Sequence, residues 1–584
     1  MAGRRDAMIF LADRTAASPM TSHHSGKSAA IHLILPAIAA LAIAIGLYSL
    51  KNSAYLDIDA AQYLSVARNL LDGSGLTSSL VYYEEQLMQE RMPAPQTVFP
   101  PGMPLVMAPW LAVGLDPGDA AHLAGVLFFC ATGLVIAVVL RRLGVGSLLT
   151  LAGALIWYVQ GTAWANVVIG RTETLFTLLV LLSAAVLLTA RERLLRYLLA
   201  GAFAAAAVLV RYQGIFFILA LGLWCAWMLW RETETGRWRL MGRAAALLSL
   251  PVLTTVLLIV RNLALVGSPG GGPVDTAHHL PAHGMGVFQS AYWALIPFLG
   301  LSLDGLAEFR WPEWAVVAGI LALALWLVIN RTILPAGPAR SPDRHEHAAL
   351  LQLLVAYLIV TFAALGFLAT RSSGYMEGRF FASLVPLAIL AWVVAVHRWI
   401  EWPVRRKDLL IAALCVLHAG LLAGQLDVIR ARLRDMQEDL RMASLKAALA
   451  EPFGGTSLDR FLARNVTVRA PLLATGGQQL WLLLQLPIVE TTPAGFTHRT
   501  FDEREVNRLS RCFGIRYLMY VPGWFRPGRL ENWNQPLLEA IARGEDPESM
   551  ILRLRTPKVA FYEFRRPAGA EAANAQDTAN HDCR

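Results

Sequence analysis

Charged side chains are scarce in this sequence: they make up 16% of its 584 residues, whereas 56% of the residues are hydrophobic. This composition excludes an ordinary soluble protein of the same length and indicates an integral membrane protein. The five cysteines do not form a disulfide framework, and only Cys512 and Cys583, near the C-terminus, lie where an external bridge could form. A G-x-G-x-x-G fingerprint of dinucleotide binding is also absent.

Apolar runs near the ~20 residues that a bilayer requires recur over most of the chain. They predict about eleven membrane helices, at 31–50, 120–140, 147–166, 173–190, 195–212, 214–230, 243–261, 314–330, 348–370, 380–397 and 408–425. Residues 101–115 are also apolar, but this segment is short and rich in proline. It is therefore expected to be a broken helix outside the set of spans.

Arginine and lysine give the chain a net charge of +9, and most of them lie in alternate loops between the apolar runs. If the N-terminal segment 1–30 is cytoplasmic, every inside loop is basic, as the positive-inside rule expects. This distribution indicates topology and excludes a nucleic-acid-binding stripe. The C-terminal region is then expected outside a plasma (inner) membrane, in a periplasm-like space.

The loop after the first span, residues 51–118, carries two acidic residues of interest, Asp57 and Asp59. They open a stretch with apolar residues at helical spacing, namely Ala60, Leu64, Ala67 and Leu71. Both have a purely structural explanation. Asp57 can be the N-cap of this helix, and Asp59 can stabilise the positive end of the helix dipole from the first turn. The alternative is a site for a lipid-borne substrate. The acidic stretch that follows is expected to be mobile and solvated, with Glu84, Glu85 and Glu90.

This loop contains the pattern D-x-x-x-Y-L-x-x-A-R-x-L-x-x-G, made by Asp59, Tyr63, Leu64, Ala67, Arg68, Leu70 and Gly73. The pattern resembles the first external loop of the GT-C glycosyltransferases, which take sugars from polyprenyl-phosphate carriers. The most similar branch includes the protein O-mannosyltransferases and the lipid A aminoarabinose transferase. The resemblance implies that Asp59 is the catalytic base and that Tyr63 and Arg68 belong to the substrate loop. Many members have Glu after this acid, where the present chain has Ala60.

Three further segments resemble the same family: R-T-E-T-L-F with Glu173, L-V-R-Y-Q-G with Arg211, and G-R-F-F-A-S-L-V-P with Arg379. Arginine gives bidentate donors to phosphate, so the arginines at external span ends are predicted to bind the donor phosphate. These are Arg171, Arg211, Arg261, Arg371 and Arg379. The alternative for any one of them is a side chain that snorkels to lipid headgroups.

No cofactor is expected to be required, and Glu173 and Asp57 are second candidates for the base. A divalent metal on Asp57 and Asp59 fits their spacing, but it is disfavoured because arginines already supply positive charge for a phosphate. His278, His279 and His283, in the loop 267–314, are interpreted as solvated, because histidines in a loop rich in glycine and proline usually are.

After about residue 425 the composition changes. Strands are predicted at 470–475, 487–491 and 515–521, helices at 476–486, 501–513 and 535–543, and a strand pair after them. This alternation predicts a small external α/β domain at 426–567, which follows the membrane domain 31–425 and precedes a disordered tail at 568–584. A phosphate cradle at Gly476-Gly477 is conceivable, although two glycines alone are a weak signal.

The sequence therefore predicts a multi-span α-helical, GT-C-like membrane protein with a small external α/β domain. Its expected activity is inverting transfer of a hexosyl or pentosyl group from a polyprenyl-phosphate carrier to a hydroxyl of a glycan, lipid or protein. Two alternatives stay open. A transporter or flippase would place charges near the midplane and show internal repeats, and a non-catalytic assembly subunit would not need Asp59.

Overall fold

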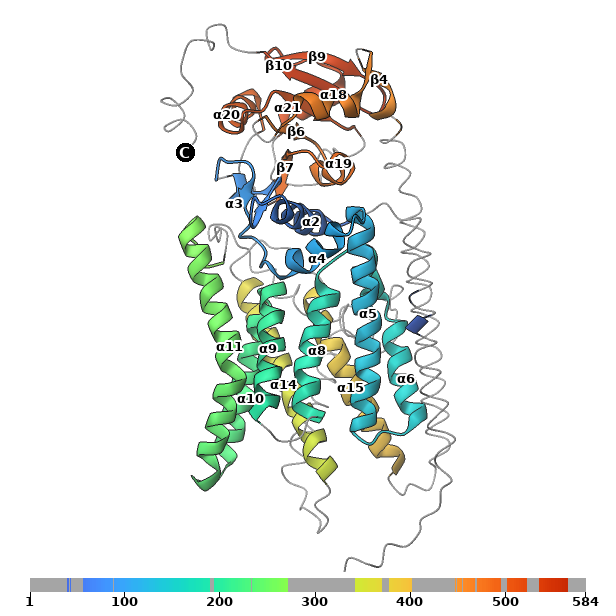
Figure 1. Ribbon diagram of the computed structural model, residues 1–584, viewed down its shortest axis with the longest axis vertical. Coiled ribbons are helices and arrows are strands. Elements are labelled where there is room, and N and C mark those ends of the chain that lie inside the picture. Colours follow the sequence, from blue (N-terminus) through green and yellow to red (C-terminus); the bar gives the residue numbers. More distant parts are fainter. Residues whose placement is uncertain are drawn as a thin grey trace, which may run out of the picture.

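A computed structural model of the 584-residue chain has an apolar helical bundle at one end and a mixed α/β region at the other (Figure 1). The structure describes residues 39–40, 43, 56–87, 89–189, 194–232, 234–270, 342–369, 378–401, 447, 449–453, 455–467, 470–494, 501–522 and 535–565. The predicted spans at 314–330 and 408–425, and nearly all of the span at 31–50, lie outside these residues. So do Arg371 and the three loop histidines.

The bundle is built from helices whose bounds follow the apolar runs of the sequence. They are α5 (Pro117–Arg142), α6 (Ser147–Tyr158), α7 (Gly161–Val168), α8 (Glu173–Thr189), α9 (Leu194–Val210), α10 (Gly214–Arg231), α11 (Glu234–Val266), α14 (Pro342–Ala369), the 3-10 helix η1 (Gly378–Leu384) and α15 (Val385–Glu401). Within the described residues, four helical stretches are long and apolar enough to cross a membrane: Pro117–Arg142, Gly214–Arg231, Gly236–Val266 and Phe380–His397. Shorter apolar helices pack between them.

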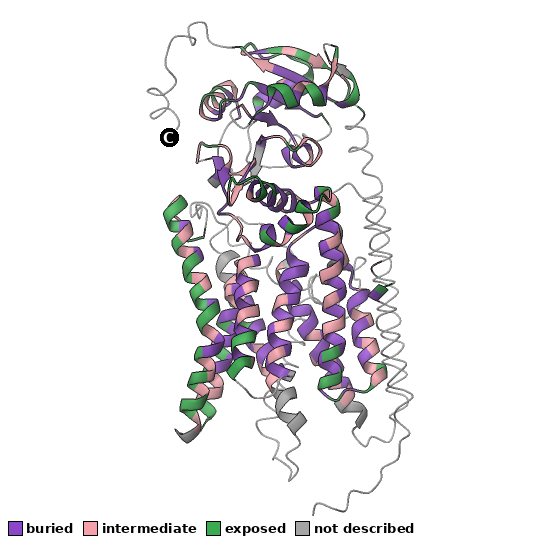
Figure 2. Cartoon of the chain, viewed as in Figure 1, coloured by how far each residue is buried: buried purple, intermediate pink, exposed green. Residues whose placement is uncertain are grey.

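Small residues bring these helices close together. A Cβ atom at Gly201 in α9 would overlap the backbone carbonyl oxygen of Leu247 in α11, so glycine is required for this contact. Much of α11 is exposed (Figure 2), including the apolar residues Leu253, Leu257 and Val260. An exposed apolar face of this kind is suited to lipid.

One predicted span differs from the structure. The run 147–166 is divided into α6, which ends at Tyr158, and α7, because the backbone of Gln160 is extended and interrupts the helix before α7 begins. The indole of Trp164 in α7 donates to the backbone carbonyl of Tyr158 at 2.7 Å, which satisfies an acceptor left at the end of α6.

The first loop is folded over the end of the bundle. It contains α2 (Ile58–Leu71), β1 (Thr77–Ser78), β2 (Leu80–Tyr83), α3 (Glu84–Leu87), β3 (Ala94–Pro95) and α4 (Gly102–Ala112). As expected for the proline-rich segment, α4 is only 11 residues long and contains Pro109. The expectation of a mobile acidic stretch is wrong in part, because 80–87 forms β2 and α3 and Glu90 lies 3.5 Å from Arg508, with both side chains 21% exposed.

A six-stranded sheet has the order β2-β7-β6-β8-β10-β9. Its strands after β2 are β6 (Leu472–Ala474), β7 (Ile488–Ala494), β8 (Tyr517–Tyr520), β9 (Met550–Arg555) and β10 (Ala560–Phe564). The neighbours β2–β7, β7–β6 and β6–β8 are parallel, whereas β10 is antiparallel to both β8 and β9. Strand β2 therefore comes from the first loop, and the other five come from the C-terminal region.

The helices of the C-terminal region are α18 (Leu458–Asn465), α19 (Gly477–Leu484), α20 (Glu503–Phe513) and α21 (Pro536–Arg543), and a short pair, β4 (Pro452–Phe453) and β5 (Thr456–Ser457), precedes them. The strands and helices predicted between 470 and 564 are present within a few residues of their expected bounds. In Figure 1 this region lies above α2, α3 and α4, which separate it from the bundle.

Candidate active site

Helix α2 begins with the two acidic residues of the first loop. Asp57 precedes the helix, and its carbonyl accepts the first helical hydrogen bond, from the Ala61 amide, at 3.1 Å. Its carboxylate Oδ2 lies 2.5 Å from Nε of Arg171, and these side chains are only 13% and 18% exposed. Asp57 therefore occupies the position of a cap but forms an ion pair with an arginine from a distant part of the chain.

The turn before α8 brings Arg171 to this place. Gly170 has a positive φ of 71°, and a Cβ atom there would lie 2.8 Å from Leu56 and 3.1 Å from Ala60. The Asp57 amide donates to the carbonyl of Ile169 at 2.9 Å, which fixes the turn against the start of α2. Ala60 is 1% exposed and lies against Gly170.

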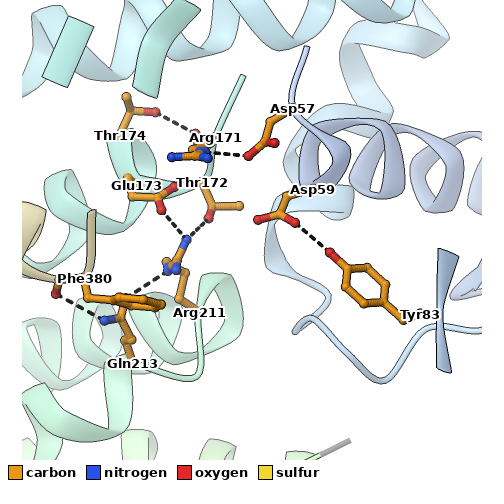
Figure 3. A network of polar contacts seen from close by, with 10 residues as sticks. All are labelled: Asp57, Asp59, Tyr83, Arg171, Thr172, Glu173, Thr174, Arg211, Gln213 and Phe380. Carbon is orange, nitrogen blue, oxygen red and sulfur yellow. Dashed lines mark hydrogen bonds and ion pairs between the residues drawn. The ribbon is translucent and has the colours of Figure 1, made fainter. Parts of the chain in front are cut away.

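A second ion pair lies beside the first. Glu173 opens α8 and is 2% exposed, and its Oε1 lies 2.8 Å from Nη1 of Arg211, which follows α9. The same nitrogen donates to Oγ1 of Thr172 at 2.8 Å. Gln213, two residues further along the chain, accepts from Nε of Arg211 at 3.1 Å and donates to the Phe380 carbonyl in η1 at 3.2 Å (Figure 3).

Asp59 is held by a tyrosine from the next strand. The phenol of Tyr83, at the end of β2, donates to Oδ1 of Asp59 at 2.7 Å. Burial, and then the negative charge of Asp59, raise the pKa of Tyr83 well above its ordinary value, so the phenol remains a donor. In Figure 3, Asp59 lies between Tyr83 and the group formed by Thr172 and Arg211. The sequence analysis did not identify Tyr83.

Tyr63, four residues after Asp59, is 2% exposed and connects the two parts of the cluster. It forms a hydrogen bond with Thr172, and burial raises its pKa well above the ordinary value, with Asp59 acting in the same direction. Its ring also packs edge-on against Phe99, with 5.0 Å between ring centroids. Tyr63 thus lies within the cluster, as its place in the loop pattern predicts.

The helix α2 has a second buried face, which is polar and which the sequence analysis also missed. Its members Gln62, Ser65 and Asn69 follow the helical spacing, and all are at most 7% exposed. Ser65 accepts from the Ser79 amide at 2.9 Å, and Asn69 donates to the Thr77 carbonyl at 2.9 Å. By contrast Leu71, expected on the apolar face, is 43% exposed, so the buried apolar face ends at Ala67.

The remaining predicted residues are distributed more widely. Arg261 in α11 donates to the Gln96 carbonyl at 2.7 Å and so contacts the far end of the same loop. Arg379 lies in η1, directly before Phe380. Arg68 is 49% exposed on the outer face of α2, where it lies 3.7 Å from Asp72. The structure therefore brings together Asp57, Asp59, Tyr63, Arg171, Glu173 and Arg211, with Arg68 outside this group.

The glycine pair of the C-terminal region is occupied by the chain itself. Gly476 and Gly477 open α19 after β6, and both amides donate to the carboxylate of Glu490 in β7, which is 1% exposed. A carboxylate already neutralises this helix N-terminus, so the conceivable phosphate cradle is filled. Within the described residues, no three or more His, Cys, Asp or Glu side chains form a group that could hold a metal.

The fold resembles known structures although the sequence identity to them is low. No protein-family model and no curated protein sequence matches the chain. It is similar to the crystal structure of ArnT from Cupriavidus metallidurans bound to undecaprenyl phosphate, with 14% identity, a TM-score of 0.54, and coverage of 91% of this chain and 97% of that chain. The apo structure of the same protein gives 14% identity, a TM-score of 0.55, and coverage of 92% and 98%. The chain therefore has the fold of the GT-C glycosyltransferases, as its loop motifs predict.

Proposed function

We propose that the chain is an inverting membrane glycosyltransferase that moves a sugar from a polyprenyl-phosphate carrier to an acceptor hydroxyl. The observation that carries the proposal is the cluster at the end of the bundle, where three carboxylates lie among two arginines. A similar fold that holds undecaprenyl phosphate, in ArnT, supports this class of donor. The proposal covers a hexose or a pentose as the sugar, and a glycan, lipid or protein as the acceptor.

In this mechanism Asp59 is the general base. It takes the proton of the acceptor hydroxyl, whose oxygen attacks the anomeric carbon while the bond to the phosphate oxygen breaks. Attack and departure on opposite faces invert the anomeric centre. Tyr83 orients the Asp59 carboxylate, and no metal is required by the proposal.

The departing lipid phosphate develops negative charge, which positive side chains stabilise. Arg171 and Arg211 are proposed for this role, with Arg379 and Arg261 as further ligands from η1 and α11. Asp57 and Glu173, earlier candidates for the base, are each bound to one of these arginines. We therefore assign them to orienting the arginines.

The site is proposed to face the outside of the plasma membrane, with the N-terminus in the cytoplasm. Two observations support this orientation. Cys512 is disulfide-bonded, and disulfides persist in oxidising compartments. The exposed arginines Arg141, Arg142 and Arg231 close the helices α5 and α10 at the end of the bundle away from the loop.

The test is donor consumption in membranes that contain wild-type protein or the Asp59→Asn variant, followed by mass spectrometry of the polyprenyl-phosphate sugars. Loss of a general base lowers turnover by roughly 100- to 10,000-fold. Asp72→Asn is a matched control, because Asp72 follows the same helix but is 58% exposed. Equal donor consumption by wild type and Asp59→Asn, at equal folded levels, would refute the assignment and favour a transporter or an assembly subunit.

A further inference from the structure

Strand β2 lies between the helix that carries Asp59 and a strand from the far end of the chain. On one side α2 side chains bind Leu80 in the strand and Ser79 just before it, and on the other side the strand pairs in parallel with β7. The strand is thus the one element of the first loop that joins the C-terminal sheet, within the residues that the structure describes. Its last residue is Tyr83, which holds Asp59.

The edge of β2 that faces away from β7 is satisfied by side chains. Gln62 donates to the Leu80 carbonyl at 2.8 Å, and Oε1 of Gln86 accepts from the amides of Tyr82 and Tyr83 at 3.0 and 3.1 Å. Gln62 and Gln86 are fully buried. Both glutamines therefore replace the strand that would otherwise pair with this edge.

The other edge depends on β7. The Ile488 amide donates to the Ser79 carbonyl at 2.8 Å, and Leu80 and Val81 pair with Ile488 and Val489. The two β2 side chains point to opposite faces, Leu80 into the core shared with the bundle and Val81 into the core of the C-terminal region. Both faces of β2 are therefore packed, chiefly against residues that follow the membrane helices in sequence.

The pairing also changes register just before the catalytic contact. Val81 pairs with Val489, but Tyr83 pairs with Ala494, so an irregularity in β7 separates the two. Such irregularities re-aim a side chain relative to a regular strand. The position of the Tyr83 phenol is thus set by its pairing with β7 as well as by the first loop itself.

We propose that the C-terminal region is a positioning component of the catalytic site: β7 holds β2, and β2 holds Tyr83 against Asp59. This inference rests on the proposed function. It gives the C-terminal sheet a role in proton transfer at Asp59 that is separate from any recognition of the acceptor. Ile488 and Val489 act through Tyr83 and are positioning residues.

The first test is Ile488→Pro in the full-length protein, which deletes the amide that donates to Ser79. Two quantities are measured: amide hydrogen exchange of residues 78–87, and donor turnover as kcat and KM. We expect faster exchange there, a kcat that falls by about 10- to 100-fold, and an unchanged KM for the donor. The control is Leu552→Pro in β9, at the opposite edge of the sheet, which should leave exchange at 78–87 unchanged.

If Ile488→Pro does not fold, two less disruptive variants replace it: a test variant, Val489→Ala, and its control, Leu518→Ala. Val489→Ala removes a fully buried contact next to Val81, and Leu518→Ala removes a larger fully buried side chain on β8. Only the first should lower kcat. In a Tyr83→Phe background, Val489→Ala should have little further effect, because the phenol that it positions is already gone.

Two results would overturn the inference. One is unchanged amide exchange at 78–87 in both β7 variants. The other is a double variant, Tyr83→Phe/Val489→Ala, whose fold-loss in kcat equals the product of the fold-losses of the two single variants. An inactive wild-type protein would instead refute the proposed function, and with it the catalytic part of the inference. The exchange measurement needs no substrate, so it distinguishes that case from a failure of the β2–β7 coupling.

Discussion

The ion pair between Glu173 and Arg211 allows stability and catalysis to be separated by mutation. Glu173 is 2% exposed and the Arg211 side chain 13%, so either charge alone would be almost completely buried. Removing one partner of a buried pair costs ~3–5 kcal/mol in the free energy of unfolding, because the other charge is left uncompensated. Replacing both by uncharged side chains of similar size is often neutral.

We therefore expect Arg211→Met to lower the free energy of unfolding by ~3–5 kcal/mol, and the double variant Glu173→Gln/Arg211→Met to recover most of this loss. Turnover should behave differently. Both variants lack the proposed phosphate ligand, and a hydrogen bond to a charged group contributes ~1.5–3 kcal/mol, so both should turn over donor at least ~10-fold more slowly.

The assay compares thermal unfolding in detergent with donor turnover in membranes for the wild type, Arg211→Met and the double variant. A double variant as unstable as Arg211→Met would show that the pair does not determine stability. A stable double variant with wild-type turnover would remove Arg211 from the donor site.

Two further outcomes test the site. Arg379→Ala should weaken binding of the lipid donor by ~1–3 kcal/mol, whereas Arg68→Ala, at the exposed surface, should not; equal affinities for the two variants would exclude Arg379. Burial raises the pKa of Tyr63 and Tyr83, so both phenols should keep their protons as pH rises past ~10. The hydrogen bond from the Tyr83 phenol to Asp59 should therefore be lost only at a pH above ~10. In an ultraviolet titration, Tyr83→Phe should therefore leave unchanged the number of tyrosines that ionise near their usual pKa.

Features that depend on local sequence were predicted well. Within the described residues, the apolar runs predict α5, α8, α9, α10, α11, α14 and α15, because bilayer thickness and helical rise fix the length of a span. The strands β6, β7 and β8 follow from short apolar segments between turn residues. Asp59, Glu173 and Arg211 were singled out because each stands in a motif at the end of a helix, and the structure brings their side chains into one cluster. Their roles stay predictions.

Features that depend on distant pairing were not predicted. Tyr83 lies in a stretch whose glutamates suggested a solvated loop, and nothing local shows that β7 lies beside it. The glutamine contacts of α2 were missed because a polar stripe on a helix is normally taken as solvent-facing. The spacing of Gln62, Ser65 and Asn69 was the signal that could have revealed them. Glu490 at Gly476 is likewise visible only once β6 and β7 are paired.

The parallel pairing of residues 80 and 81 with 488 and 489 also bears on how the protein is made. A growing chain that has already inserted its membrane helices still lacks β7, so β2 has an open edge and the core around Val81 is incomplete. The contact has a very large sequence separation, and contacts of this kind form late in folding. The Asp59 environment is thus completed only after β7 has been synthesised and lies on the same side of the membrane as the loop.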